Sequence, residues 1–413
     1  MRTAKSIAIL HFAAPPTVGG VEKTLFYQAL TLIEMGYSPC VVSGQGRQFH
    51  SDINLHRIPE MYSQHPKVLA VNHDLSQGKV TSKFYELRDD LTTRLNRILA
   101  KVEVAIVHNV LTLHKNLALS AALWNLTDQN VVKIIAWCHD IAWQDELYTS
   151  NLFTGYPWNL LKMAWPGVKY VTVSEDRRKD LSQLIGLNQK EIAVVNPGVD
   201  IENFMKLELA TKKIIQKLDL MNCDPLMLLP VRITRRKNIE LALKVTAELR
   251  QTCPQVGLVV TGPPGAHNQT NVEYWESLRK LRAELNLTAN AHFLFEVGKM
   301  IKIPKISDGI IADLYRISDL LLFPSRREGF GIPTIEAGLS RLPIFSADLP
   351  PVRESTLGFA SYFDPDDAPG SVAETILDFL KEDHSYQFKH RVVDEYSWRQ
   401  ITVKKIIPLI KSM

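Results

Sequence analysis

Short, continuously apolar runs alternate with stretches of helical period along the first half of the chain. The run Ser6–Phe12 is followed by a helical pattern over Val21–Met35 and by a second apolar run at Ser38–Ser43. Unbroken Val and Ile runs of this length are typical of strands buried on both faces, and their alternation with helices predicts a doubly wound parallel sheet. The pattern continues with runs at Val104–His108, Val131–Cys138 and Val168–Ser174, and with helical stretches that reach Ala122 and cover Glu175–Ile185.

A second alternation begins after the Pro-Gly turn of Val195–Val199. Because 413 residues exceed what a single core usually supports, we expect two domains, residues 1–199 joined by helices at about 393–413, and residues 200–392. The predicted fold class is α/β, with two Rossmann-like, doubly wound domains. The strand-like runs of the second half are Leu226–Val231, Gly257–Thr261, Ala291–Phe295 and Leu320–Phe323, and its helical stretches include Asn238–Thr252, Glu273–Leu285 and Ala312–Ile317.

Three segments depart from this alternation. Ile58–Lys83 has neither the helical nor the strand period and is predicted to be a long, mobile loop. Lys83–Lys101 alternates positive and negative charges, which indicates a solvated surface rather than a membrane-seeking helix. The aromatic tract Trp143–Trp165 fits either a sugar-stacking acceptor wall or a packed lid.

Composition narrows the class of protein. A hydrophobic fraction of 46% and a charged fraction of 22% are typical of a globular chain. The net charge of +4 is too small to indicate nucleic-acid binding, although it permits contact with an anionic membrane surface. The four scattered cysteines lack metal-binding spacing, so we expect free thiols, no metal and a cytoplasmic location. Arg2 and Lys5 precede an apolar run as in a signal peptide, but this run suits a first strand, and no longer run predicts a transmembrane helix.

Glycines and carboxylates follow the apolar run Leu320–Phe323. Glu328 is followed by the loop Gly329–Gly331, and Pro333 marks a helix start, where proline is favoured. The free amides at a helix start bind anions such as phosphate. Glu336 lies about one helical turn further, on the face that looks back at the loop. Carboxylates repel phosphate but suit hydroxyl groups, so we expect a ligand with phosphates in its middle and sugar hydroxyls on both sides.

Cationic residues follow the apolar run Leu226–Val231 in the string PVRITRRKN. Arg232 comes directly after the run and Lys237 five positions later. A diphosphate leaving group needs such cations as its charge grows in the transition state. Arg235 and Arg236 are expected to face solvent.

Two places in the first half also carry candidate chemistry. Gly19 and Gly20 lie between the first strand and the first helix, where glycine allows a ligand to approach the backbone closely. Their spacing is not that of a dinucleotide-binding G-x-G-x-x-G loop. His139 follows a predicted strand at its carboxyl end, where ligands bind in open α/β sheets.

These residues resemble the motifs of retaining glycosyltransferases of family 4, which have the GT-B fold of two domains facing a cleft. The spacing of Glu328 and Glu336 resembles the family's E-x7-E motif, and Thr261–Gly265 departs from the family's glycine-aspartate-glycine string. The resemblance implies that Glu328 and His139 contact the transferred sugar, that Arg232 and Lys237 bind the diphosphate, and that Glu336 binds the ribose. The implied catalytic residues are Glu328, His139, Arg232 and Lys237, and the implied donor-binding residues are Gly19, Gly20, Gly329, Phe330, Gly331, Ile332, Pro333, Thr334 and Glu336.

The same resemblance implies the reaction. A hexose moves from a UDP-, GDP- or ADP-sugar to the hydroxyl of a small-molecule, glycan or lipid-linked acceptor, by front-face attack and without a metal or other cofactor. A nucleotide-sugar epimerase or a sugar phosphorylase on the same fold is an alternative, although no signature of a pyridoxal phosphate lysine is visible. A lipid glycosyltransferase docked on the inner face of the membrane is a third possibility.

Overall fold

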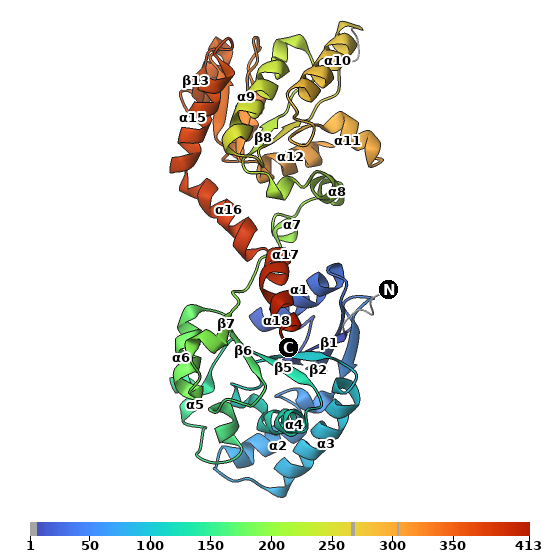
Figure 1. Ribbon diagram of the computed structural model, residues 1–413, viewed down its shortest axis with the longest axis vertical. Helices are drawn as coiled ribbons and strands as arrows, with labels where there is room; N and C mark the ends of the chain where they lie inside the picture. Colours follow the sequence, from blue (N-terminus) through green and yellow to red (C-terminus); the bar gives the residue numbers. More distant parts are fainter. Residues whose placement is uncertain (1–5, 266–268, 304) are drawn as a thin grey trace. The chain divides into compact units, whose positions relative to one another are not determined.

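The computed structural model describes residues 6–265, 269–303 and 305–413. The chain divides into two compact units, Met1–Asp200 with Glu395–Met413 (unit 1) and Ile201–Asp394 (unit 2) (Figure 1). Arg2 and Lys5, which gave the N-terminus its likeness to a signal peptide, lie outside the described residues, as do residues 266–268 after the Thr261–Gly265 string.

Unit 1 contains a seven-stranded parallel sheet in the order β3-β2-β1-β4-β5-β6-β7. The predicted doubly wound class is confirmed, because every neighbouring pair of strands is parallel. Two of these strands, β3 and β7, are short and were not predicted. The strands are β1 Ser6–Ala13, β2 Ser38–Gln45, β3 Asn54–Arg57, β4 Val104–His108, β5 Lys133–Cys138, β6 Lys169–Thr172 and β7 Ile192–Val194.

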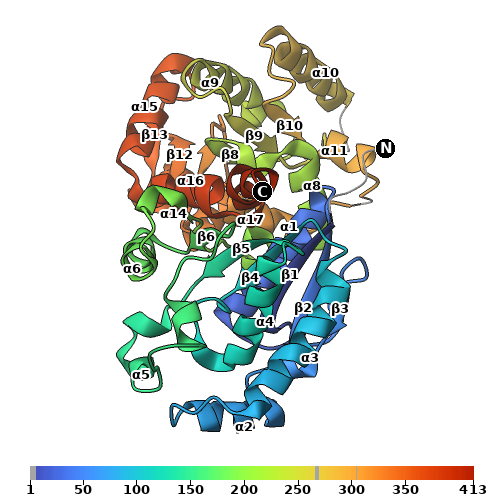
Figure 2. The same ribbon diagram turned by 60° about the horizontal axis from the view of Figure 1, so that its bottom comes forward.

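Helices cover both faces of this sheet, as the alternating side chains of β1 require. Ala8 and Leu10 pack on the face covered by α3 and α4, whereas Ile7 and Ile9 pack on the face covered by α1 (Figure 2). The helices of unit 1 are α1 Gly20–Glu34, η1 Pro59–Met61, α2 Pro66–Leu75, α3 Ser82–Leu99, η2 His114–Asn116, α4 Leu117–Asp128, η3 Ala142–Gln144, α5 Glu146–Thr149, η4 Trp158–Leu161, α6 Glu175–Ile185 and η5 Gln189–Glu191, followed near the C-terminus by α17 Trp398–Ile401, the π-helical turn η8 Thr402–Ile406 and α18 Ile407–Lys411.

The prediction of a mobile loop over Ile58–Lys83 is wrong. The segment contains the turn η1 and the ten-residue helix α2, with Pro66 in the first turn of α2. Val68, Val71 and Leu75 are buried at the three- and four-residue spacing of one helical face. This short apolar stripe was overlooked among polar neighbours. The following charged segment is α3, whose leucines are buried while its charges remain at the surface, so only its outer face is solvated.

The aromatic tract is largely packed inside unit 1. Trp158 and Trp165 are each 2% exposed, and Trp165 Nε1 donates a hydrogen bond to Leu160 O at 2.9 Å. The C-terminal helices pack on α1, where Trp398 stacks on Tyr27 with ring centroids 5.8 Å apart.

Unit 2 contains a six-stranded parallel sheet in the order β10-β9-β8-β11-β12-β13. The apolar run Ala291–Phe295 is a strand only to Phe293, because α11 begins at Leu294. The strands are β8 Leu226–Leu229, β9 Gly257–Val260, β10 Ala291–Phe293, β11 Leu320–Phe323, β12 Ile344–Ala347 and β13 Ser361–Phe363. The helices are α7 Ile201–Phe204, α8 Leu209–Leu218, η6 Leu220–Asn222, η7 Arg235–Lys237, α9 Ile239–Thr252, α10 Gln269–Glu284, α11 Leu294–Met300, α12 Asp308–Ile317, α13 Ile332–Leu339, α14 Pro350–Thr356, α15 Pro369–Glu382 and α16 His384–Tyr396.

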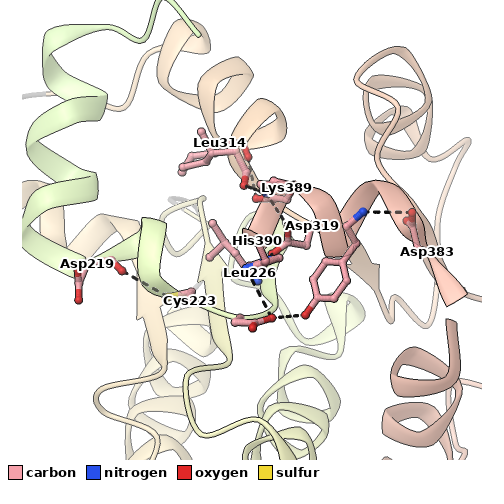
Figure 3. A network of polar contacts seen from close by, with 12 residues as sticks. Asp219, Cys223, Leu226, Leu314, Asp319, Asp383, Lys389 and His390 are labelled. Carbon is pink, nitrogen blue, oxygen red and sulfur yellow. Dashed lines mark hydrogen bonds and ion pairs between the residues drawn. The ribbon is translucent and has the colours of Figure 1, made fainter. Parts of the chain in front are cut away.

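A polar network holds α16 against the amino ends of β8 and β11 (Figure 3). The carboxylate of Asp319, just before β11, accepts hydrogen bonds from Leu226 N at 2.7 Å and from Lys389 Nζ at 2.6 Å. His390 Nε2 lies 3.1 Å from the same carboxylate. Burial would raise the pKa of Asp319, but the hydrogen bond from His390 and the charges of Lys389 and His390 outweigh it, and the pKa is lowered.

Candidate active site

The glycine loop after β11 leads directly into α13. Gly331 is the N-cap residue, with φ 91° in the left-handed region that favours glycine, and it has no side chain to cap the helix. Thr334 closes the first turn, since its amide and its hydroxyl donate to Gly331 O at 2.9 and 2.7 Å. The backbone amides of residues 329–332 donate to no described residue. This end of the helix can therefore bind an anion.

Glu328 and Lys237 form an ion pair beside this loop, with side chains only 7% and 9% exposed. Arg236 Nη1 lies 3.5 Å from Glu328 Oε2, and Arg236 O accepts a hydrogen bond from Arg326 N at 2.8 Å. The turn η7 and the loop after β11 are therefore tied together. Arg236 is exposed, as predicted, and η7 also brings its guanidinium to Glu328. Arg235 is exposed and lies over the ring of Tyr274.

Lys237 is partly desolvated at this position. Burial lowers the pKa of Lys237, whereas the hydrogen bond and the charge of Glu328 raise it. Lys237 Nζ also lies 5.2 Å from the centroid of the Phe323 ring. A cation shielded from water attracts an anion more strongly than a solvated one does. The structure brings Glu328 and Lys237 together, so ligand groups bound to these two residues would be close neighbours.

Arg232 is exposed just beyond the carboxyl end of β8, and its guanidinium forms no ion pair within the described part of the chain. Gly262 N donates to Val231 O at 3.0 Å, which joins the loops that follow β8 and β9. A side chain at Gly262 would overlap the backbone of Val231 and Arg232, so this close approach requires glycine. The unusual string Thr261–Gly265 thus helps to position Arg232.

Glu336 is exposed on α13, and its Oε2 accepts a hydrogen bond from Tyr315 OH at 2.7 Å. Burial, followed by the hydrogen bond to Glu336, raises the pKa of Tyr315, so the phenol stays protonated and can hold the carboxylate in place. Tyr315 comes from α12 and was not predicted as a site residue. Its only sequence signal was a buried position in a helix, which does not indicate that Glu336 is its partner. Phe330 and Ile332 are exposed beside this region.

In unit 1, Gly19 and Gly20 lie where α1 begins. Gly19 is extended, with φ −173°, so its conformation does not require glycine. A Cβ on Gly20 would meet nothing within 4 Å, and one on Gly19 would meet only the flexible end of Glu22. Because the described residues do not require glycine here, the missing side chains leave the start of α1 accessible to a ligand.

Three histidines lie in a row across the carboxyl half of the same sheet. They come from the neighbouring strands β1 and β4 and from the residue after β5. His11 Nδ1 lies 3.1 Å from His108 O, and His108 Nδ1 lies 3.1 Å from His139 Nε2. His108 is fully buried, and His108 Nε2 lies 2.9 Å from Gln28 Oε1 of α1. The predicted residue His139 is therefore the outer member of a connected group, the histidine row His11–His108–His139.

The histidine row is uncharged near neutral pH. Burial lowers the pKa of His11 and that of His139 to about 4, and it lowers the pKa of His108 well below its ordinary value. A neutral imidazole has one donor and one acceptor nitrogen. Because Gln28 Oε1 must accept from His108 Nε2, His108 Nδ1 accepts from His139 Nε2. His139 Nδ1 is then left as a hydrogen-bond acceptor, suited to a sugar hydroxyl.

Asn109 fixes the backbone of His139. Asn109 Oδ1 accepts hydrogen bonds from His139 N at 2.7 Å and Asp140 N at 3.1 Å, and Asn109 Nδ2 donates to Asp140 Oδ2 at 3.0 Å. Asn109 has φ 61°, a left-handed conformation that asparagine tolerates. Asn109, His11 and His108 were all missed in the sequence, where their only signal was a polar residue at or near the carboxyl end of a strand.

The predicted site residues thus fall into two groups, one at the carboxyl edge of each sheet. Arg232, Lys237, Glu328, Glu336 and the loop at 329–334 lie in unit 2. Gly19, Gly20 and His139 lie in unit 1. Within the described ranges no cluster of three or more His, Cys, Asp or Glu side chains is arranged to hold a metal ion. No helix in the described ranges is long and apolar enough to cross a membrane.

Two family models match successive parts of the chain. The model described as Glycosyltransferase Family 4 matches residues 18–203, and the model described as Glycosyl transferases group 1 matches residues 210–394. The two matched regions correspond closely to the two units, and together they include every predicted site residue.

Two curated proteins resemble this chain at 26% and 28% identity over part of its length. Mannosylglucosylglycerate synthase of Petrotoga mobilis is 26% identical over 276 residues, which cover 62% of this chain and 63% of that protein. D-inositol 3-phosphate glycosyltransferase of Nocardia farcinica is 28% identical over 184 residues, which cover 44% of this chain and 38% of that protein. The matches therefore span less than two thirds of the length of either relative.

Solved structures of glycosyltransferases align along almost the whole chain at low similarity. A glycosyltransferase from Rickettsia africae is 18% identical, with 99% of this chain and 98% of that chain covered and a TM-score of 0.37. Anabaena HepE in complex with UDP-glucose is 17% identical, with 99% and 100% covered and a TM-score of 0.38. Scores this low support no functional argument.

Proposed function

The chain belongs to glycosyltransferase family 4, and from this membership we propose that it transfers a hexose from a nucleotide-diphosphate sugar to an acceptor hydroxyl with retention of configuration. The observation that carries the proposal is the junction of β11 and α13 in unit 2. There an uncapped helix start, a desolvated lysine and two carboxylates lie on adjoining turns.

The donor fits the order of these groups. The amides of residues 329–332 and the cations Lys237 and Arg232 suit the diphosphate. Glu336, held by Tyr315, suits the ribose hydroxyls, and Glu328 suits a hydroxyl of the transferred sugar. The name of one relative, D-inositol 3-phosphate glycosyltransferase, also refers to glycosyl transfer, although it leaves the nucleotide and sugar of this chain undefined.

In the proposed reaction the bond between the anomeric carbon and the β-phosphate oxygen breaks, and its electron pair stays on the phosphate oxygen. The acceptor oxygen forms the new bond on the same face of the sugar, and its proton passes to the departing phosphate. Lys237, Arg232 and the helix amides stabilise the diphosphate charge as it develops. In unit 1, His139 Nδ1 is an acceptor for a hydroxyl of the transferred sugar.

A thermal-shift screen of UDP-, GDP- and ADP-hexoses tests the donor first. The preferred donor is then incubated with candidate acceptors, and proton NMR of the product reports whether the new linkage keeps the α configuration. An inverted linkage would overturn the retaining mechanism. Incubation of the donor without acceptor tests the epimerase alternative, since only an epimerase would change the sugar under these conditions. Release of a sugar 1-phosphate from an added glycoside in the presence of inorganic phosphate, with the rest of the glycoside as the leaving group, would instead indicate a phosphorylase.

A further inference from the structure

A pocket of about 370 Å³ opens in unit 1 between three segments that each follow a parallel strand. Asn72 and Ser76 lie on and just after α2, which follows β3, and His114 and Lys115 belong to η2, which follows β4. Asn151 lies in the connection that follows β5. The pocket therefore lies at the carboxyl edge of the sheet, as the histidine row does, and its volume is in the range of small-ligand sites.

The pocket wall is rich in neutral hydrogen-bonding groups. Ser63, Asn72 and Asn151 contribute hydroxyl and amide groups, and Trp158, almost wholly buried, contributes an apolar edge. Asn72 Nδ2 donates to Lys115 O at 2.9 Å, which joins α2 to η2 and leaves Asn72 Oδ1 as an acceptor. His114 Nδ1 is buried without a hydrogen-bond partner among the described residues. Such a wall suits a ligand with several hydroxyl groups.

The described residues of the pocket wall include basic side chains and no acidic ones. Lys115 is exposed at the pocket and forms no ion pair with a described carboxylate, and none of the described lining residues is Asp or Glu. Burial lowers the pKa of His114 and the charge of Lys115 lowers it further, so Lys115 is the cation of the pocket at neutral pH. Lys115 also contributes to the lowered pKa of His11, behind burial and His139, so its field reaches the histidine row.

We propose that this pocket binds the acceptor, and that the acceptor is a polyhydroxylated molecule with an anionic group that pairs with Lys115. The role of the ligand as acceptor rests on the proposed glycosyl transfer, whereas the binding of an anionic polyol does not. The wall of amides and hydroxyls recognises the polyol, and Lys115 recognises a phosphate or carboxylate.

Calorimetry without any nucleotide sugar tests the binding directly. The probes are myo-inositol 1-phosphate, glycerol 3-phosphate and glucose 6-phosphate, each compared with its neutral polyol and with inorganic phosphate. We expect at least one polyol phosphate to bind about tenfold more tightly than the corresponding neutral polyol and than inorganic phosphate. A factor of about ten in affinity corresponds to the loss of one charged hydrogen bond. Equal affinity for the phosphorylated and neutral forms, or for inorganic phosphate alone, would overturn the proposal.

Lys115→Gln tests the residue, with Lys133→Gln as a matched control. Lys133 is an exposed lysine at the amino end of β5, the opposite edge of the same sheet. Lys115→Gln should lose the roughly tenfold preference for the phosphorylated probe and keep its melting temperature and its affinity for nucleoside diphosphate. Lys133→Gln should keep all three properties. Retention of the preference in Lys115→Gln would overturn the assignment.

The source of the anionic polyol is settled by a second arm. Flotation with vesicles containing phosphatidylinositol, compared with pure phosphatidylcholine vesicles, tests a lipid headgroup, and the free phosphates test a small molecule. Binding that Lys115→Gln weakens in either experiment supports the proposed pocket. Binding that Lys115→Gln leaves unchanged in both experiments overturns it. If the chain binds a polyol phosphate through Lys115 but converts no nucleotide sugar, the proposed glycosyl transfer is overturned and the proposed binding pocket is not.

Discussion

Strands β8 and β11 have a lysine–carboxylate pair at each end, and the two pairs differ in how completely they are satisfied. At the amino ends, Asp319 pairs with Lys389 of α16 and also accepts from Leu226 N and His390 (Figure 3). At the carboxyl ends, Glu328 pairs with Lys237 of η7. Both carboxylates are nearly buried, with side chains 1% and 7% exposed.

The surroundings of the two pairs explain the difference. Among the described residues, the Asp319 network contains no buried side-chain donor or acceptor without a partner. Near Glu328, by contrast, the hydroxyls of Ser325 and Thr234 are buried without partners, and the loop at 329–332 has free amides. A satisfied network rigidifies the fold, whereas unsatisfied groups around a charged pair indicate a place where a ligand supplies the missing partners.

The largest expected effect comes from changing each carboxylate to its amide. Asp319→Asn leaves Lys389 without its charged partner, and loss of one member of a buried pair typically costs about 3 to 5 kcal/mol in the free energy of unfolding. Glu328→Gln should abolish most transfer while nucleoside diphosphate still binds. Urea denaturation and calorimetry on both variants measure the contrast. Equal losses of stability in Asp319→Asn and Glu328→Gln would show that the two lysine–carboxylate pairs contribute equally to the fold.

Lys237→Ala should lower turnover by about two to three orders of magnitude, because a preorganised cation beside the leaving group is lost. Lys244→Ala, on the exposed face of α9, is the control and should leave turnover unchanged. Arg232→Ala should act on the same diphosphate, so the double variant should lose less than the product of the single losses. Strict multiplication of the two defects would place Lys237 and Arg232 in separate sites.

Glu336→Ala should weaken nucleoside diphosphate binding by about 1.5 kcal/mol, the lower end for a hydrogen bond to a charged group, because Glu336 is exposed. Tyr315→Phe should have a smaller effect in the same direction, since it only frees the carboxylate. Calorimetric titration with nucleoside diphosphate measures both. Unchanged affinity in a folded Glu336→Ala variant would remove Glu336 from the nucleotide site.

The pH dependence of stability should also differ between the two units. His11 and His139 have pKa values of about 4 in the folded chain and near 6.5 when unfolded, so the unfolded state binds more protons between these values. Unit 1 should lose about 1.4 kcal/mol per pH unit for each such histidine as the pH falls from 6.5 to 4. In unit 2, burial lowers the pKa of His292 of β10 to about 4, so unit 2 should lose stability over the same range, but with the smaller slope of a single such histidine among its described residues. The pKa of Asp319 is lowered from 3.8, so its contribution to unit 2 is present above that pH and is lost only below it.

Hydrogen exchange at graded pH separates the two units. Amides of β1, β4 and β5 should lose protection at a higher pH than amides of β8 and β11. His108→Gln removes one buried imidazole and should flatten the slope in unit 1, whereas His56→Gln, at an exposed position of β3, should not. Acid sensitivity that begins in unit 2 would contradict the assignment of neutral histidines.

Long elements and local motifs were predictable from the sequence. The buried strands β1, β4, β8 and β11 are unbroken apolar runs, and the Glu328-to-Glu336 motif is contained within nine consecutive residues. Strands β7 and β13 were missed because three residues show no period.

Contacts between distant segments required the tertiary structure. His108 lies 97 positions from His11 and 31 from His139, and only the strand order β1-β4-β5 makes them neighbours. Likewise, Lys237 meets Glu328 across 91 positions because β8 pairs with β11. Apolar periodicity depends only on residues that are close together in the sequence, so it can be recognised without the structure. The pairing of strands is decided by burial over the whole sheet, and with it the protonation and partners of every group at the sheet's carboxyl edge.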